Sequence, residues 1–263
     1  MNSWVNGKLQ THVPISNRGM AYGDGVFETI RLSAGKTPLW GFHLERLNAG
    51  LNTLGIELGN IAWLDNVLSV AHDMPEAILK LIAYRADSAR GYYSEQTKAD
   101  LCVALTPFDN KPASGLTVDV SANALSNNHH LGGIKHLCRL EQVLAAQEAK
   151  QRALDELLML DSQGQLVESI SSNLFLYIDK QWYTPSIEGC GVAGVMRRFI
   201  LEKVSELEVD VRAISLSDLE KVSAAFLSNS VRRVMPIKRI GDKVLDLAPS
   251  QACVKTINLY FDA

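Results

Sequence analysis

Apolar runs of strand length and amphipathic runs of helix length follow one another along this chain in no regular order. Residues 26–32 alternate apolar and polar side chains, as a half-buried strand does, whereas leucines recur at helical spacing over residues 42–54. A strict strand–helix–strand alternation is missing, so the pattern favours two α+β domains. The length of 263 residues has room for two domains of moderate size.

The same periodicities predict the remaining elements. Strands are expected at residues 4–9 (around an Asn6-Gly7 turn), 38–40 (in a hairpin with 26–32), 78–84, 101–105, 116–120, 157–160, 166–170, 173–178, 181–184, 224–227 and 231–237. Helices are expected at residues 65–71, 140–154, 195–207 and 252–261. Turn-forming residues gather at 107–115, so we expect one domain at 1–110, a linker at 111–115 and a second domain at 116–263.

Composition excludes several classes of protein. A net charge of −3 gives no electrostatic case for binding nucleic acid. No apolar run approaches the roughly 20 residues that a membrane helix requires, and the first ten residues do not resemble a signal peptide. The four cysteines form no C-x-x-C pair and the adjacent His129 and His130 lack helical ligand spacing, so we expect no metal site. Free thiols in a cytoplasmic protein are the expectation.

Two isolated charged residues in apolar surroundings are candidates for chemistry. Lys135 stands alone among apolar residues just before a helix, where burial would lower its pKa and leave the neutral amine that Schiff-base chemistry needs. Glu168 lies in an otherwise apolar strand, where its carboxylate could keep a pyridine nitrogen protonated. Taken singly, each pattern favours a structural residue: a lysine that reaches solvent from an edge strand, or a solvent-facing strand glutamate.

Two further features of the sequence are candidates for binding an anion. Residues 191–197 are a glycine loop that opens a helix, and such a helix start offers free backbone N–H groups to a phosphate, although it can also be a plain junction. Arg46, on an amphipathic helix, could bind a phosphate with its two-pronged guanidinium or could be an ordinary surface arginine.

In their order along the chain, five segments resemble the fold-type IV pyridoxal-phosphate enzymes, the group of branched-chain aminotransferase, D-amino acid aminotransferase and 4-amino-4-deoxychorismate lyase. The segments are residues 17–31, 43–47, 134–142, 167–175 and 191–197, and the likeness extends over residues 16–236. It implies an α+β, two-domain fold with a small N-terminal α/β domain and a larger C-terminal β-barrel-like domain with helices, which carries the cofactor lysine. It also implies a homodimer.

The resemblance assigns roles at matching positions. Lys135 would bind pyridoxal 5'-phosphate covalently and move protons, and Glu168 would pair with the pyridine nitrogen. The phosphate would be held by Arg46, by the backbone N–H groups of Val195 and Met196, and by Ser230, whose alignment is looser by a residue.

Two segments resemble the lyase branch of the family: residues 133–142 around the lysine, and the arginine loop 90–94. The implied reaction converts 4-amino-4-deoxychorismate to 4-aminobenzoate and pyruvate in folate synthesis, with Arg90 and Arg139 as candidates for the substrate carboxylates. A transaminase acting on D-amino or branched-chain amino acids would share the lysine, the glutamate and the phosphate site. A cofactor-binding module without catalysis, and an α+β domain without any cofactor, are the remaining alternatives.

The chain departs from the family pattern at a few positions. Cys138 stands where asparagine is usual, Asn17 where aspartate is usual, and Arg232-Arg233 where a smaller or acidic pair is usual. These departures leave the cofactor assignment intact and loosen the choice of substrate.

Overall fold

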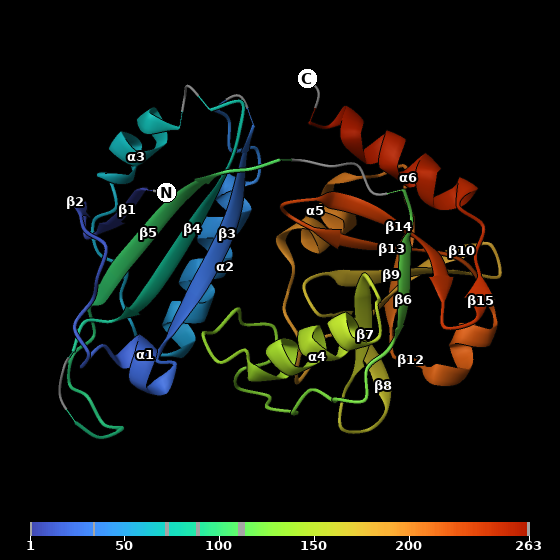
Figure 1. The fold of residues 1–263 in the computed structure, drawn as a ribbon, viewed down its shortest axis with the longest axis horizontal. Helices are drawn as coiled ribbons and strands as arrows, with labels where there is room; N and C mark the ends of the chain where they lie inside the picture. The colour runs from blue at the N-terminus through green and yellow to red at the C-terminus, as the bar shows by residue number, and fades with distance from the viewer. Residues whose placement is uncertain (1, 34, 72–73, 88–89, 110–113, 262–263) are drawn as a thin grey trace. The chain divides into compact units, whose positions relative to one another are not determined.

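The computed structural model describes residues 2–33, 35–71, 74–87, 90–109 and 114–261. Its internal contacts divide the chain into two compact units, Met1–Asn110 with Ile134–Cys138, and Lys111–Gly133 with Arg139–Ala263 (Figure 1). The arrangement is the α+β fold expected from the sequence. The exact domain limits of 1–110, 111–115 and 116–263 stay a prediction, and residues 111–113 lie outside the described part of the chain.

The first unit is built on a five-stranded antiparallel sheet in the order β2-β1-β5-β4-β3. Its strands are β1 (Asn2–Val5), β2 (Lys8–Leu9), β3 (Gly25–Ser33), β4 (Glu76–Arg85) and β5 (Ala99–Pro107). Its helices are α1 (Arg18–Tyr22), α2 (Trp40–Thr53) and α3 (Leu64–Val70). Alternate apolar residues of β3, β4 and β5 pack with Leu47 and Leu51 of α2, so one sheet face forms the core of this unit.

The segment that carries Lys135 belongs to this unit because it pairs with the free edge of β3. The backbone N–H of Phe27 donates to the carbonyl of Lys135 at 3.0 Å, and Leu137 donates to the carbonyl of Gly25, also at 3.0 Å. A bridge between Val26 and His136 shows that the added segment runs antiparallel. The sequence-based boundaries instead assigned this lysine to the C-terminal domain; long-range sheet pairing of this kind leaves no local sequence signal.

The second unit is a barrel with helices. Its sheet runs in the order β11-β10-β9-β13-β14-β6-β7-β8-β12, and the additional pairing of β8 with β9, through Glu168 and Asn173, closes β9, β13, β14, β6, β7 and β8 into a ring. The strands are β6 (Leu116–Val120), β7 (Glu156–Leu160), β8 (Gln165–Ser169), β9 (Asn173–Ile178), β10 (Gln181–Pro185), β11 (Val209–Arg212), β12 (Ile214–Ser215), β13 (Val222–Asn229), β14 (Arg233–Ile240) and β15 (Lys243–Val244). The α-helices are α4 (Leu140–Gln151), α5 (Val195–Lys203) and α6 (Ala248–Leu259), and a 3₁₀ helix, η1, spans Leu216–Glu220.

Most elements expected from periodicity are confirmed, with shifted ends. The strand expected at 38–40 is wrong: only an isolated bridge joins Ser33 to Lys36, and Trp40 already begins α2. Helix α5 ends at Lys203 rather than 207. Helix α1 and strand β11 were not expected, because short elements give too few residues for a periodic pattern.

The unusual Asn17 has a clear local role. Its side-chain oxygen accepts a hydrogen bond from the N–H of Met20 at 2.9 Å and so caps α1, which asparagine does as well as aspartate. Gly23 ends α1 in the left-handed conformation with φ of 67°, which a glycine adopts without strain. None of the helices in the described ranges is long and apolar enough to cross a membrane.

Candidate active site

Glu168 is a buried carboxylate in the barrel wall. It lies on β8 with 4% of its surface exposed. Its Oε2 accepts the backbone N–H of Val192 at 2.8 Å, and Nε2 of Gln142, on α4, lies 3.5 Å from its Oε1. Burial of a carboxylate is costly unless hydrogen bonds or a cationic group compensate it. The position therefore suits a binding partner that carries a proton or a positive charge.

The loop before α5 approaches this carboxylate closely. Gly191 has a φ of 76°, and a Cβ there would lie 2.6 Å from Val167 and 3.4 Å from the carboxylate of Glu168. At Gly194, a Cβ would collide with the side-chain oxygen of Asn173 at 1.7 Å. Gly133 anchors the loop, since it donates to the carbonyl of Gly191 at 3.1 Å and accepts from the N–H of Ala193 at 2.9 Å. Glycine is needed at positions 191 and 194 because a side chain there would clash with Val167 or Asn173.

The start of α5 presents backbone N–H groups that could bind an anion. The first intrahelical bond runs from the N–H of Arg198 to the carbonyl of Gly194, at 2.9 Å. The N–H groups of Val195 and Met196 therefore precede the helical ladder, and Gly194 supplies no side-chain cap. Both residues are buried, so an acceptor such as a phosphate oxygen would satisfy groups that are otherwise costly to bury.

Ser230 lies in the turn that follows β13. Oδ1 of Asn229 shapes this turn by accepting the N–H groups of Val231 and Arg232, at 3.0 and 2.7 Å. Ser230 itself is half-buried. Two positions earlier, the hydroxyl of Ser228 is buried and meets no hydrogen-bond partner among the described residues. An orphaned buried hydroxyl beside this turn is a further sign that the region accommodates a polar ligand.

In the first unit, Lys135 extends over an aromatic ring. Its Nζ lies 4.5 Å from the centroid of the Phe27 ring, and its backbone is fixed to β3 by the hydrogen bond from Phe27. The side chain is half-buried. The backbone pairing of this segment with β3 therefore holds the Lys135 amine over the Phe27 ring.

Lys80 is a residue that the sequence reasoning missed. Its Nζ lies 4.0 Å from the centroid of the same Phe27 ring, and burial lowers its pKa. It borders a mostly apolar hollow of about 200 Å³ on the sheet face opposite the core, which Ile82 and Cys102 also line. The available signal was the alternation of β4, which places Lys80 and Ile82 on the face opposite the core residues Leu79 and Leu81.

Arg46 is bound to an acidic residue of the same unit. Its Nε lies 2.8 Å from Oε1 of Glu28, and its Nη2 lies 2.5 Å from Oε2. Nδ1 of His43, one turn earlier on α2, lies 2.6 Å from the same Oε2. Burial alone would raise the pKa of Glu28, but the hydrogen bonds from His43 and Arg46 outweigh burial and lower it. Burial lowers the pKa of His43, and the charges of Arg46 and Lys135 lower it further.

The two candidate substrate arginines lie in different units. Arg90 is exposed on the loop between β4 and β5. Arg139 is half-buried at the start of α4. Within the first unit the structure brings together Lys135, Phe27 and Lys80. Within the second it brings Glu168 to the glycine loop that leads into α5.

Comparison with known proteins identifies the family. The sequence profile of amino-transferase class IV matches residues 25–240. The chain belongs to this family. It is 34% identical to the aminodeoxychorismate lyase of Vibrio harveyi over 250 residues, which cover 90% of this chain and 91% of the relative.

Solved structures of this family share the fold. The crystal structure of 4-amino-4-deoxychorismate lyase from Pseudomonas aeruginosa is 31% identical, with a TM-score of 0.91 over 99% of this chain and 100% of that chain. An aminotransferase from Brucella abortus, bound to the cofactor PLP, is 18% identical with a TM-score of 0.84, over 100% of this chain and 99% of that one. The latter likeness concerns the fold alone. The expected membership in a class IV aminotransferase-like family is confirmed.

Proposed function

We propose that this chain is a pyridoxal-phosphate-dependent lyase that converts 4-amino-4-deoxychorismate to 4-aminobenzoate and pyruvate. The observation that carries the proposal is the agreement of sequence and fold: the Vibrio and Pseudomonas lyases each exceed 30% identity over nine tenths or more of the chain. The reaction would serve folate synthesis, since 4-aminobenzoate is the folate precursor.

The residues present fit the cofactor. An N–H cluster at a helix start suits a phosphate, and a buried carboxylate suits a protonated pyridine nitrogen. Val195, Met196 and Ser230 would hold the phosphate with Arg46, Glu168 would bind the ring nitrogen, and Lys135 would bind the aldehyde carbon. When bound, pyridoxal phosphate supplies an electron sink for the charge that develops when the substrate loses a proton.

Lys135 would carry the proton transfer. Its Nζ would take the proton from C4 of the substrate, which requires the unprotonated amine. Glu168 would keep the ring nitrogen of the bound cofactor protonated. Loss of the C4 proton together with the enolpyruvyl group makes the substrate ring aromatic, and the released enol becomes pyruvate. No oxidant and no second substrate are needed.

Cationic side chains would orient the substrate through its carboxylates. Arg90 and Arg139 remain the candidates proposed from the sequence, and we add Lys80. The support for Lys80 is its place over the Phe27 ring, which Lys135 also overlies. An amine in partly apolar surroundings binds a carboxylate more strongly than one in water.

We also propose a cytoplasmic homodimer. All four cysteines are free thiols, which suits a reducing compartment. Helix α4 exposes Leu140, Val143 and Leu144, spaced as one apolar stripe, which supports a partner surface. Light scattering of the purified protein tests the dimer.

One assay separates the lyase from a transaminase of the same fold. The purified enzyme is given 4-amino-4-deoxychorismate with and without 2-oxoglutarate or pyruvate. Formation of 4-aminobenzoate at enzymatic rates without an oxo acid supports the lyase, and turnover that depends on the oxo acid supports the transaminase. A purified protein with no visible absorption band of bound cofactor would instead support a module that does not catalyse.

A further inference from the structure

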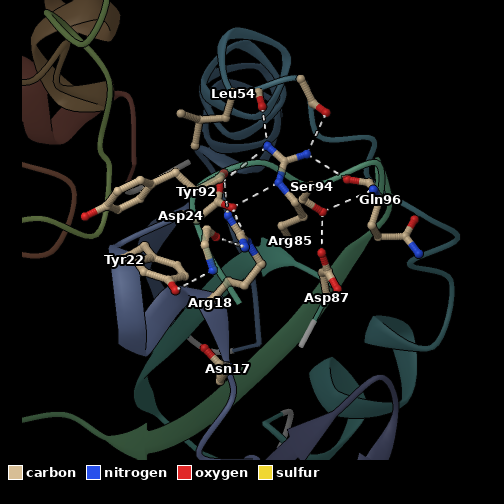
Figure 2. A network of polar contacts seen from close by, with 12 residues as sticks. Asn17, Arg18, Tyr22, Asp24, Leu54, Arg85, Asp87, Tyr92, Ser94 and Gln96 are labelled. Carbon is tan, nitrogen blue, oxygen red and sulfur yellow. Dashed lines mark hydrogen bonds and ion pairs between the residues drawn. The ribbon is translucent and has the colours of Figure 1, made fainter. Parts of the chain in front are cut away.

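A buried arginine holds the loop that carries Arg90. Arg18, the first residue of α1, is only 2% exposed. Its Nη1 donates to the carbonyl of Gly91 at 2.9 Å. Its Nη2 donates to the carbonyl of Tyr92, also at 2.9 Å (Figure 2). These two carbonyls belong to the residues that directly follow Arg90. One guanidinium therefore fixes the backbone next to the candidate substrate-binding side chain.

A second arginine fixes the far end of the same loop. Arg85, at the end of β4, donates from Nη1 to the carbonyl of Gln96 at 2.8 Å and from Nη2 to that of Leu54 at 2.5 Å. Asp24 joins the two arginines: its Oδ2 lies 2.8 Å from Nε of Arg18 and 2.9 Å from Nε of Arg85 (Figure 2). The shared carboxylate sets the direction in which both guanidiniums point.

Tyr22 adds a third attachment from the last residue of α1. Its hydroxyl accepts the N–H of Gly91 at 3.1 Å, and its ring meets that of Tyr92 edge-on, with centroids 5.5 Å apart. The guanidinium carbon of Arg18 lies 4.9 Å from the Tyr22 ring centroid. Gly91 is thus bound at both its N–H and its carbonyl, and both partners come from α1.

Little apolar burial supports this part of the loop. The side chains of Tyr92 and Tyr93 are 90% and 79% exposed. Ordering a loop backbone costs conformational entropy, and here packing offsets little of that cost. The polar contacts from Arg18 and Tyr22 are therefore the main described interactions that hold Gly91 and Tyr92 in place. An arginine that only stabilised α1 would have no need of loop carbonyls.

We propose that Arg18 is a positioning residue for the reaction, which acts by fixing the backbone that carries Arg90. The proposal rests on the proposed function, in which Arg90 binds a substrate carboxylate. A binding side chain contributes most when its backbone is already ordered, because the substrate then does not have to order it. Arg18 itself would not touch the substrate.

A double-mutant cycle tests the proposal. Arg18→Met and Arg90→Met are each expected to raise KM about tenfold while kcat changes little. If Arg18 acts through Arg90, the double variant has the KM of Arg90→Met alone. A KM that rises in the double variant by the product of both single effects would overturn the proposal. Tyr22→Phe removes one contact to the loop and leaves the buried network of Arg18 and Asp24 intact, so it should raise KM by a smaller factor. This variant replaces Arg18→Met in the test if Arg18→Met does not fold.

A second readout is independent of activity. Trypsin cuts after arginine, and the Arg90–Gly91 bond is held by the contacts to Gly91. Arg18→Met, at a temperature where circular dichroism shows it folded, is expected to be cut there at least severalfold faster, as mapped by mass spectrometry. An unchanged cleavage rate would overturn the tethering role by itself. Faster cleavage with a normal KM in Arg90→Met would overturn the substrate role of Arg90 and the positioning role that depends on it.

Discussion

The guanidinium of Arg46 lies against the carboxylate of Glu28, with Nε 2.8 Å from Oε1 and Nη2 2.5 Å from Oε2. Glu28 is 1% exposed, so the pair is nearly removed from water. The sequence suggested that Arg46 serves the cofactor phosphate. The structure gives it a second role that does not depend on any cofactor, and the two roles can be measured separately.

Arg46→Ala is expected to destabilise the cofactor-free protein by about 3 kcal/mol, because it leaves the buried Glu28 carboxylate without its cation. Urea denaturation of the cofactor-free enzyme measures this loss. Arg46→Lys keeps the charge but not the two-pronged contact, and should lose about 1 kcal/mol. A cofactor-free Arg46→Ala variant as stable as the parent protein would leave phosphate binding as the only role of Arg46.

His43 makes stability depend on pH. Its pKa lies below the ordinary 6.5, since burial disfavours the imidazolium and the charges of Arg46 and Lys135 add to this effect. The unfolded chain therefore takes up this proton at a higher pH than the folded chain. The contribution of His43 to the free energy of unfolding is fully present above pH 6.5. It decreases as the pH drops below that value, by at most about 1.4 kcal/mol per pH unit.

Comparison with His43→Gln isolates this effect from the other histidines. The free energy of unfolding is measured for both proteins at pH 5.5 and pH 7.5, a range in which Glu28, whose pKa is lowered, stays ionised. The parent protein should lose more stability on acidification than the variant. Equal losses in both proteins would mean that His43 keeps its ordinary pKa.

Lys135→Ala is expected to abolish covalent attachment of the cofactor. Treatment with borohydride followed by mass spectrometry should show the added mass on the peptide that contains residue 135 in the parent protein and on no peptide of the variant. Turnover should fall by about 10²–10⁴-fold, the usual contribution of a proton-transfer group. A reducible cofactor on another lysine of the variant would move the assignment elsewhere.

Lys80→Met tests the additional carboxylate contact. Loss of one hydrogen bond from a charged group costs about 1.5–3 kcal/mol, so KM should rise at least about tenfold, with kcat nearly unchanged. Lys80→Arg keeps the charge at the same place on β4 and should retain most of the affinity. An unchanged KM in Lys80→Met would show that the lysine serves only to cover the Phe27 ring.

The features that could be predicted from the sequence are those that depend on residues adjacent along the chain. Apolar and polar side chains alternate over residues 26–32, and this segment lies in β3. The glycine loop at 191–197 could be recognised as the start of a helix from its own residues. Pairings between distant segments could not be predicted in the same way. Nothing near Lys135 indicates that its backbone pairs with Phe27, and nothing near Arg46 indicates that Glu28 accepts its guanidinium. Lys80 was overlooked because the feature that singles it out is its contact with the ring of Phe27, on the neighbouring strand.

Glu168→Gln separates the charge of the buried carboxylate from its shape. An amide oxygen can still accept the N–H of Val192, which bonds Glu168 at 2.8 Å, so the loop and the cofactor should stay in place. The neutral amide cannot hold a proton on the ring nitrogen, and turnover should therefore fall by about 100-fold or more. Glu156→Gln is the matched control, because burial raises the pKa of that carboxyl, also in the barrel, and no catalytic role is assigned to it. If absorbance shows bound cofactor and Glu168→Gln turns over as fast as Glu156→Gln, the carboxylate does not support the electron sink.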